Sequence, residues 1–260
     1  MMMPFDDLPP HSEPVLLGPD PQFGEINLAQ LQQLGMVTHM GGRTGVAEDF
    51  RLIKRPLLRA ARGQDGPAIR HGNLIVVTSS LPGEGKTYCA INLAMSMAME
   101  RDTTVLLVDA DVARPSVLNV LGLPARAGLM DVLLDDDLDL SDVILKTNIP
   151  ALCLLPAGRS NRHATELLAS RSMSRLLDDI ADRYPDRIVI FDSPPLLITT
   201  EASVLAAQMG QVVLVVEAGR TTHGSVREAL RQLEPCRHVN LICNKSATGT
   251  AGAGYYSYFE

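Results

Sequence analysis

A glycine-rich turn between an apolar run and a helical run carries the strongest chemical signal in the sequence. Residues 74–87 have the sequence LIVVTSSLPGEGKT, in which Gly83 and Gly85 allow backbone N–H groups to turn inward around phosphate oxygens. The N-terminus of the following helix adds favourable partial charge. The Lys86 ammonium would reach the β- and γ-phosphates, and the Thr87 hydroxyl would ligate Mg²⁺. The predicted nucleotide-binding segment comprises Pro82, Gly83, Glu84, Gly85, Lys86, Thr87 and Tyr88.

The turn departs from the common P-loop pattern at one position. That pattern has glycine six residues before the lysine, where this sequence has Ser80. A chance glycine-rich turn remains a poor explanation, because strand, turn, Lys-Thr and helix occur together in the order that a phosphate site requires.

Acidic residues end two further apolar runs. The run VLLVDAD contains Asp109 and Asp111, and the run IVIFD ends in Asp192. Ligands of open α/β sheets bind at the carboxyl ends of the strands, so we expect these acids beside the phosphate site. Asp192 would hold Mg²⁺ through water, and Asp109 or Asp111 would take a proton from an attacking hydroxyl. A single acid after a strand is usually a solvated loop residue, but two such strand ends beside a P-loop favour the functional interpretation.

Apolar runs alternate with helical patterns from residue 74 onwards. Strands that are apolar throughout and separated by helices predict a parallel sheet covered on both faces. Right-handed crossovers make this fold a doubly wound α/β sandwich of the P-loop NTPase type. The predicted strands are 74–78, 105–108, 152–155, 188–191, 212–217 and 239–243, and the predicted helices are 47–61, 86–99, 166–184, 201–209 and 225–233.

Composition excludes several classes of protein. Hydrophobic residues make up 46% and aromatic residues 4%, which predicts a globular domain with an aliphatic core. A net charge of −7 without Lys/Arg runs argues against nucleic-acid binding. The four scattered cysteines predict reduced, buried thiols. No apolar run approaches the about 20 residues of a membrane span, so we expect a cytoplasmic protein.

Two terminal segments differ from the central domain of residues 43–246. Residues 1–42 contain five acids and no Lys or Arg, and we expect a flexible, acidic, Pro-rich arm. Within this arm, the leucines of residues 26–36 predict a short helix, which docks either on a partner or on its own domain. Residues 247–260 form an expected tail rich in glycine and tyrosine.

These motifs together resemble those of the bacterial tyrosine kinases of exopolysaccharide systems, above all the exosortase-associated tyrosine autokinases. The resemblance extends from about residue 26 to the C-terminus. It implies that the P-loop is a Walker A motif, that LLVDADVARP is a Walker A′ motif and that IVIFDSPP is a Walker B motif. The segments that carry it are SSLPGEGKT, LLVDADVARP, LLPAGRSNRHATELLAS, IVIFDSPPLL and GYYSYFE.

Roles for individual residues follow from this resemblance. It implies that Lys86 and Thr87 contact phosphate and Mg²⁺, that Asp109 and Asp111 support Mg²⁺ and the incoming tyrosine, and that Asp192 holds Mg²⁺. Asn244 resembles the family position near the adenine. Many relatives have arginine where this sequence has Ala113, and whether Arg114 replaces it is open. Leu81 stands where partition-type ATPases carry a second lysine, which argues against an ATPase acting on DNA or membranes.

Three tyrosines, Tyr255, Tyr256 and Tyr258, lie within the last six residues. A tail this rich in glycine and alanine cannot form a core, so we interpret them as phosphoacceptors on a tether rather than as a sticky terminus. In the resembled family such tails are phosphorylated between neighbouring subunits. Each phosphate adds roughly −1.5 to −2 charge, and repulsion among tails would weaken a ring-like homo-oligomer.

Charged residues at a spacing of three begin the helix predicted for residues 47–61. Glu48, Arg51 and Lys54 resemble the E-x-x-R-x-x-R oligomerisation motif of the family, with lysine in the last place. The spacing places the three charges along one helix face. Composition alone favours a solvated face with internal salt bridges, whereas the resemblance implies a subunit interface.

The expected function is that of an ATP- and Mg²⁺-dependent protein-tyrosine autokinase. The resemblance implies control of exopolysaccharide chain length and export, with an inner-membrane chain-length determinant protein as the partner that recruits and activates the kinase. The alternative is a P-loop ATPase switch or scaffold that acts by nucleotide-dependent oligomerisation without tyrosine transfer. The phosphate motifs fit both functions, and only the tyrosine tail separates them.

Overall fold

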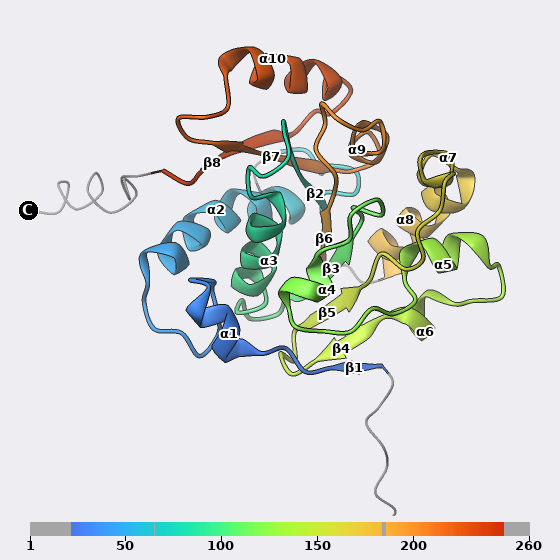
Figure 1. Ribbon diagram of the computed structural model, residues 1–260, viewed down its shortest axis with the longest axis horizontal. Helices are drawn as coiled ribbons and strands as arrows, with labels where there is room; N and C mark the ends of the chain where they lie inside the picture. The colour runs from blue at the N-terminus through green and yellow to red at the C-terminus, as the bar shows by residue number, and fades with distance from the viewer. Residues whose placement is uncertain (1–21, 65, 184–185, 247–260) are drawn as a thin grey trace, which may run out of the picture.

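One mostly parallel sheet organises the chain. The computed structural model describes residues 22–64, 66–183 and 186–246 (Figure 1). Within them the sheet has eight strands in the order β1-β4-β5-β3-β6-β2-β7-β8, which confirms the predicted doubly wound α/β class. The strands are β1 (Phe23–Gly24), β2 (Leu74–Ser79), β3 (Thr104–Asp109), β4 (Leu145–Thr147), β5 (Leu152–Leu155), β6 (Arg187–Asp192), β7 (Gln211–Glu217) and β8 (Val239–Asn244).

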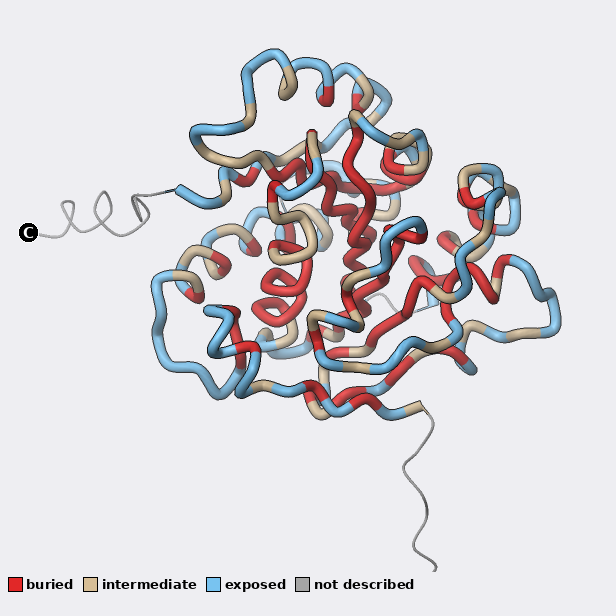
Figure 2. Tube along the Cα trace, viewed as in Figure 1, coloured by how far each residue is buried: buried red, intermediate tan, exposed pale blue. Residues whose placement is uncertain are grey.

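Helices cover both faces of this sheet. Successive residues of a strand point to opposite faces, so Ile75 and Val77 of β2 enter the core beneath α1–α4, while Leu74 and Val76 enter the core beneath α5–α10. Figure 2 shows the buried chain concentrated in the central strands and in α3. The helices are α1 (Leu28–Gln33), α2 (Gly45–Ala61), α3 (Lys86–Met97), α4 (Val117–Val120), α5 (Leu129–Leu134), α6 (Leu140–Val143), α7 (Ala164–Leu168), α8 (Arg171–Arg183), α9 (Glu201–Ala206) and α10 (His223–Gln232).

The described part of the expected N-terminal arm is folded onto the domain. Leu31 of α1 is fully buried, and the buried side chain of Asn92 in α3 accepts a hydrogen bond from the Val37 N–H at 2.6 Å. The short helix predicted within residues 26–36 therefore exists as α1 and packs on its own domain. Ile26, Leu31 and Met36 of this segment are buried in the same core as α3, so the folded part of the chain begins well before residue 43. Residues 1–21 lie outside the described residues.

Several local features differ from the pattern-based expectations. The helix expected over residues 166–184 is divided into α7 and α8, because the Ser170 hydroxyl accepts a hydrogen bond from the Met173 N–H and so starts a new helix. Strands β1 and β4 were not predicted, since two or three residues are too few to show a periodicity. Pro56 lies inside α2 without ending it. Within the described chain, no helix combines the length and the apolar character needed to cross a bilayer.

Candidate active site

The turn between β2 and α3 has the backbone shape of a phosphate-binding loop. Gly83 has a φ of 84° and Gly85 a φ of 96°, both in the region that favours glycine. A Cβ atom on Gly85 would lie 2.2 Å from the Asn244 Nδ2 atom. No side chain caps the start of α3, so its first N–H groups remain available to an anion.

The Glu84 side chain stabilises this loop through hydrogen bonds instead of facing the phosphate position. Its buried carboxylate accepts hydrogen bonds from the Leu81 N–H at 2.8 Å and from the Thr221 hydroxyl. Asn244 Nδ2 donates to the Glu84 carbonyl at 2.9 Å, and Lys245 Nζ donates to the Gly83 carbonyl at 2.7 Å. The end of β8 therefore lies against the loop. Asn244 is next to the nucleotide segment, as expected, and its contact with adenine stays a prediction.

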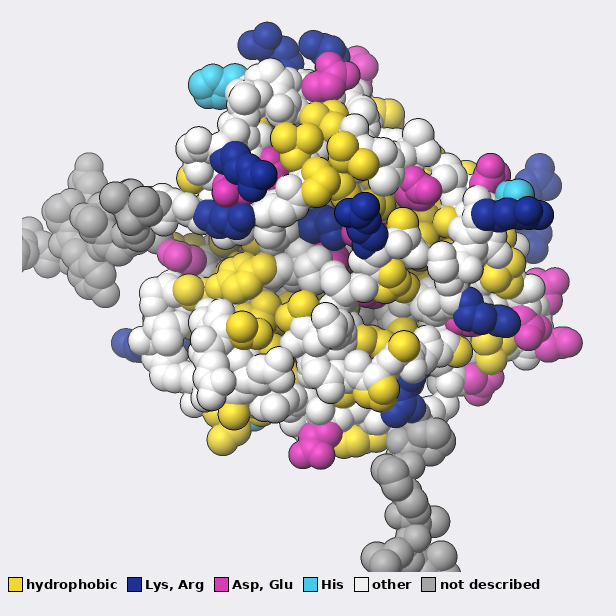
Figure 3. All heavy atoms as spheres, viewed as in Figure 1, with side chains coloured by type: hydrophobic (Ala, Val, Ile, Leu, Met, Phe, Trp, Pro, Cys, Tyr) yellow, Lys and Arg dark blue, Asp and Glu magenta, His cyan; other side chains and the backbone are white. Residues whose placement is uncertain are grey.

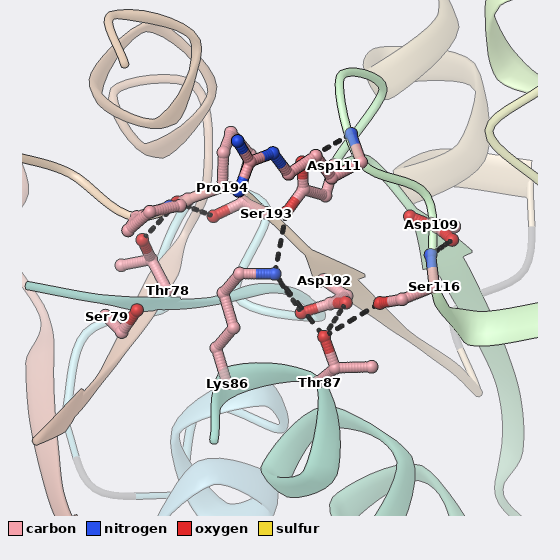
Figure 4. Close-up of polar contacts among 12 residues, drawn as sticks. Thr78, Ser79, Lys86, Thr87, Asp109, Asp111, Ser116, Asp192, Ser193 and Pro194 are labelled. Atoms are coloured by element: carbon pink, nitrogen blue, oxygen red, sulfur yellow. Dashed lines mark hydrogen bonds and ion pairs between the residues drawn. The ribbon is translucent and has the colours of Figure 1, made fainter. Parts of the chain in front are cut away.

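The three acids of the two strand ends come together around Lys86 (Figure 4). Asp109 and Asp192 are directly paired in the register of β3 and β6. Lys86 Nζ lies 2.7 Å from Asp111 Oδ2 and 3.7 Å from Asp192 Oδ1. The Thr87 hydroxyl donates to Asp192 Oδ2 at 2.6 Å. The structure thus gathers at one edge of the sheet the five residues that the sequence singled out for chemistry.

Ser116 is a member of this cluster that sequence reasoning missed. Its hydroxyl lies 3.2 Å from the Thr87 hydroxyl, and its N–H donates to Asp109 Oδ2 at 2.9 Å. The Val117 N–H donates to the same oxygen at 2.9 Å, so Asp109 fixes the start of α4. The available signal was a serine preceding a short apolar run, which is a helix-start pattern. Arg114 is exposed beside this turn.

Burial dominates the electrostatics of the cluster. Burial raises the pKa of Asp109 to about 6 and that of Asp192 to about 7. Burial also disfavours the Lys86 ammonium, but the charges of Asp192 and Asp111 outweigh it, so the pKa of Lys86 is raised. Lys86 therefore stays charged, whereas the two buried carboxyls hold protons more readily than solvated carboxyls do.

The stability of the nucleotide-free protein is expected to depend on pH through these carboxyls. The folded protein binds protons at Asp192 up to about pH 7, while an unfolded aspartate, with a pKa of 3.8, releases them earlier. Stability should therefore fall as pH rises from about 4 to 7, by up to about 1.4 kcal/mol per pH unit for this group. Urea titrations of wild type and Asp192→Asn in EDTA test this, and the variant should show a shallower slope. Asp182→Asn, at an exposed position of α8, is the control, and an equally shallow slope there would contradict the assignment.

The oxygen atoms of the cluster fit a hydrated Mg²⁺ ion. Asp109 Oδ1 and Asp192 Oδ1 are buried and accept no hydrogen bond, and the Thr87 hydroxyl lies beside Asp192. These are hard oxygen ligands of the kind that Mg²⁺ prefers. Across the described residues, no group of three or more His, Cys, Asp and Glu side chains is arranged to hold a metal.

Tyr88 and Lys54 point away from their predicted partners. The Tyr88 hydroxyl donates to the Gly35 carbonyl at 3.1 Å, so its side chain faces the N-terminal segment and only its backbone remains for a nucleotide. Lys54 was expected at an exposed interface, but its side chain is buried, donates to the Ser96 carbonyl and pairs with Glu100 at 2.7 Å. The expectation for Lys54 is wrong, because its face of α2 packs against α3.

The other predicted interface and acceptor residues lie away from this cluster. Glu48 and Arg51 form an ion pair on the solvent side of α2. Tyr255, Tyr256 and Tyr258 lie outside the described residues. Figure 3 shows Lys and Arg side chains at the middle of the face in view, with a group of hydrophobic side chains between them and α10. This face therefore offers both charge and apolar surface beside the phosphate site.

Comparison with protein families and solved structures places this geometry among known proteins. The AAA domain family matches residues 72–238. The crystal structure of the VpsO kinase domain superposes with a TM-score of 0.65 at 30% identity, covering 77% of this chain and 96% of that domain. The fold is thus shared with a solved kinase domain.

Curated relatives carry kinase names. Tyrosine-protein kinase CpsD of Streptococcus agalactiae is 30% identical over 195 residues, which cover 73% of this chain and 82% of CpsD. Putative tyrosine-protein kinase EpsB of Ralstonia nicotianae is 34% identical over 169 residues, which cover 65% of this chain. The matched part spans only 22% of the length of EpsB. With its P-loop, its paired strand-end aspartates and these relatives, the chain belongs to the bacterial tyrosine kinase family of P-loop enzymes.

Proposed function

We propose that this protein transfers the γ-phosphoryl group of ATP to a tyrosine hydroxyl. The observation that carries the proposal is the cluster of Lys86, Thr87, Asp111 and Asp192 at the mouth of a glycine-rich loop. Lys86 binds the β- and γ-phosphates together with the loop N–H groups, which stabilises the charge of the transferring phosphoryl group. Thr87, Asp109 and Asp192 would hold Mg²⁺, which would neutralise further phosphate charge.

Asp111 is the better candidate to receive the proton of the tyrosine. One carboxylate oxygen of Asp109 already accepts two backbone hydrogen bonds, which fix it at the start of α4. Asp111 accepts one backbone hydrogen bond, from the Arg114 N–H to Oδ1 at 3.2 Å, and its Oδ2 atom pairs with the Lys86 ammonium, which the phosphates would attract when nucleotide binds. The phenol oxygen attacks the γ-phosphorus, the bond to the β–γ bridging oxygen breaks, and ADP leaves. The phenolic proton passes to Asp111.

Labelling of the purified protein tests this function. Mass spectrometry before and after incubation with ATP and Mg²⁺ should reveal phosphotyrosine. We expect the modified tyrosines within residues 254–260. A variant that lacks residues 254–260 should lose the label but keep nucleotide binding. ATP hydrolysis with no phosphotyrosine in wild type would instead favour the nucleotide-dependent switch.

We also propose the setting in which the kinase acts. The resemblance to kinases of exopolysaccharide systems supports a role in the chain length and export of such a polymer, and a membrane-bound chain-length determinant protein as the partner. Phosphorylation between neighbouring copies would involve Tyr255, Tyr256 and Tyr258. Polymer length measured with and without residues 254–260 tests this role separately from the chemistry.

Charge reversal on α2 is expected to break the proposed homo-oligomer. Glu48 and Arg51 lie at the solvent surface, so Glu48→Arg should cost the isolated helix only about 0.5 kcal/mol while opposing a neighbouring copy. Sedimentation velocity should show a shift to monomer. Glu228→Arg on α10 is a matched control, because Glu228 pairs with Arg231 at the same spacing. An unchanged mass for Glu48→Arg would exclude this face as the interface.

A further inference from the structure

A cavity formed by the described residues lies at the amino ends of the strands, opposite the end of the sheet that carries the P-loop. It has a volume of about 740 Å³ and is bounded by the segments that lead into β2, β7 and β8, and by α8. A second cavity of about 380 Å³ shares Pro67, Ile69, Arg237 and His238 with it, so the two form one groove. We name this the amino-edge groove. Its size is in the range of ligand-binding sites.

Two consecutive Arg–His pairs line the amino-edge groove. Arg70 Nη2 lies 3.2 Å and His71 Nε2 lies 3.0 Å from the same oxygen of Asp178. The second pair, Arg237 and His238, is exposed, and neither side chain makes an ion pair or hydrogen bond with another described residue. The first pair thus shows how the groove holds a carboxylate. The second pair has no carboxylate partner among the described residues.

The backbone holds the first pair in a fixed shape. His71 has a φ of 53°, which is uncommon for a residue with a side chain. A Cβ atom on Gly210 would lie 2.1 Å from the His71 carbonyl oxygen, so the two segments touch through backbone alone. The buried Gln211 side chain donates to the Gly72 carbonyl at 2.6 Å. The groove is therefore built before any ligand arrives, which lowers the cost of ordering it on binding.

We propose that the amino-edge groove binds an acidic polypeptide segment, and that residues 1–21 of this chain are its occupant. This segment carries Asp6, Asp7, Glu13 and Asp20 and no Lys or Arg, which complements the unpaired Arg237 and His238. It joins the described chain at Gln22 and can span up to about 70 Å when extended, at about 3.3 Å per residue. A compact domain of this chain length has a radius of gyration of about 18 Å, so the extended segment is longer than the domain is wide and can reach the groove of its own copy or of a second copy.

Photo-crosslinking of the full chain tests this site. With Phe5 replaced by p-benzoylphenylalanine, irradiation should link residues 1–21 to the segments 67–71, 207–210 or 235–238. Arg237→Glu should reduce the yield about 10-fold, equivalent to about 1.4 kcal/mol, and added salt should reduce it as well. Replacing the four acids of the segment by amides should do the same. The mass of the product tells whether the link joins one copy or two, and either supports the site.

Arg227→Glu is the control, because Arg227 is exposed on α10 outside the groove. Links elsewhere on the chain, no links, or a yield that Arg237→Glu leaves unchanged would each overturn the proposal. Neither kinase activity nor its loss enters the readout, so the outcome is independent of the proposed function.

Discussion

Lys86→Met is expected to remove tyrosine phosphorylation, lowering its rate by about 10²–10³-fold or more. The lysine supplies the one ammonium that lies within 4 Å of both Asp111 and Asp192 in the described structure. Its removal takes away charge stabilisation of the transferring phosphoryl group, and a single such donor is typically worth that factor. Methionine keeps most of the apolar stem of the side chain, so the packing of the first turn of α3 is preserved. Phosphotyrosine measured by mass spectrometry after a fixed time with ATP and Mg²⁺ gives the rate.

Lys146→Met provides the matched control, because Lys146 is exposed on β4, which lies next to the edge strand β1 and is separated from β2, the strand that leads into the P-loop, by β5, β3 and β6. Thermal unfolding of both variants checks that the fold is kept. Labelling of Lys86→Met at the wild-type rate would remove the phosphate assignment on which the proposed function depends.

Asp111→Asn is expected to separate transfer from binding. Loss of the proton acceptor should lower the maximal rate of phosphorylation by about 10²–10⁴-fold. Nucleotide affinity should stay the same or increase, because Lys86 no longer pairs with this carboxylate and is free to bind phosphate. The rate at saturating ATP should therefore fall while the affinity for ATP, measured separately, does not.

The companion variant Asp109→Asn distinguishes the two acids. Asp109 accepts the hydrogen bonds that fix the start of α4, and its other oxygen is available to Mg²⁺. Its replacement should therefore weaken Mg²⁺ binding and also lower the stability of the fold. If Asp111→Asn transferred phosphate normally while Asp109→Asn failed only in transfer, the proton would belong to Asp109.

The residues at the carboxyl ends of the strands were predictable, because the end of a strand can be recognised from a few neighbouring residues in the sequence. An apolar run followed by an acid locates Asp109 and Asp192 without knowledge of the sheet order, and the register then pairs them directly. Ser116 was missed because its contact with Thr87 depends on the path of the turn after Asp111, which no periodicity encodes. Short strands such as β4 carry too few residues to be recognised.

Lys54 shows where a spacing argument fails. Counting by three from Glu48 places Lys54 on the charged face, but Phe50 and Leu57 lie four and three residues away on the buried face. The helix twist brings Lys54 toward α3, where Ser96 and Glu100 satisfy its charge. The apolar neighbours at helical spacing were the better guide than the charge pattern.

Two side chains at the end of β8, the last described strand, donate hydrogen bonds to the nucleotide loop, and this has a mechanical consequence. Asn244 and Lys245 hold the Glu84 and Gly83 carbonyls, and Lys245 also pairs with Glu217 at 3.1 Å. Tension on the chain beyond residue 246 would therefore act first on these contacts with the loop. Under the proposed function, a neighbouring copy that captured this end of the polypeptide would pull on the loop proposed to bind ATP, so substrate capture by one copy would be coupled to nucleotide retention in the other.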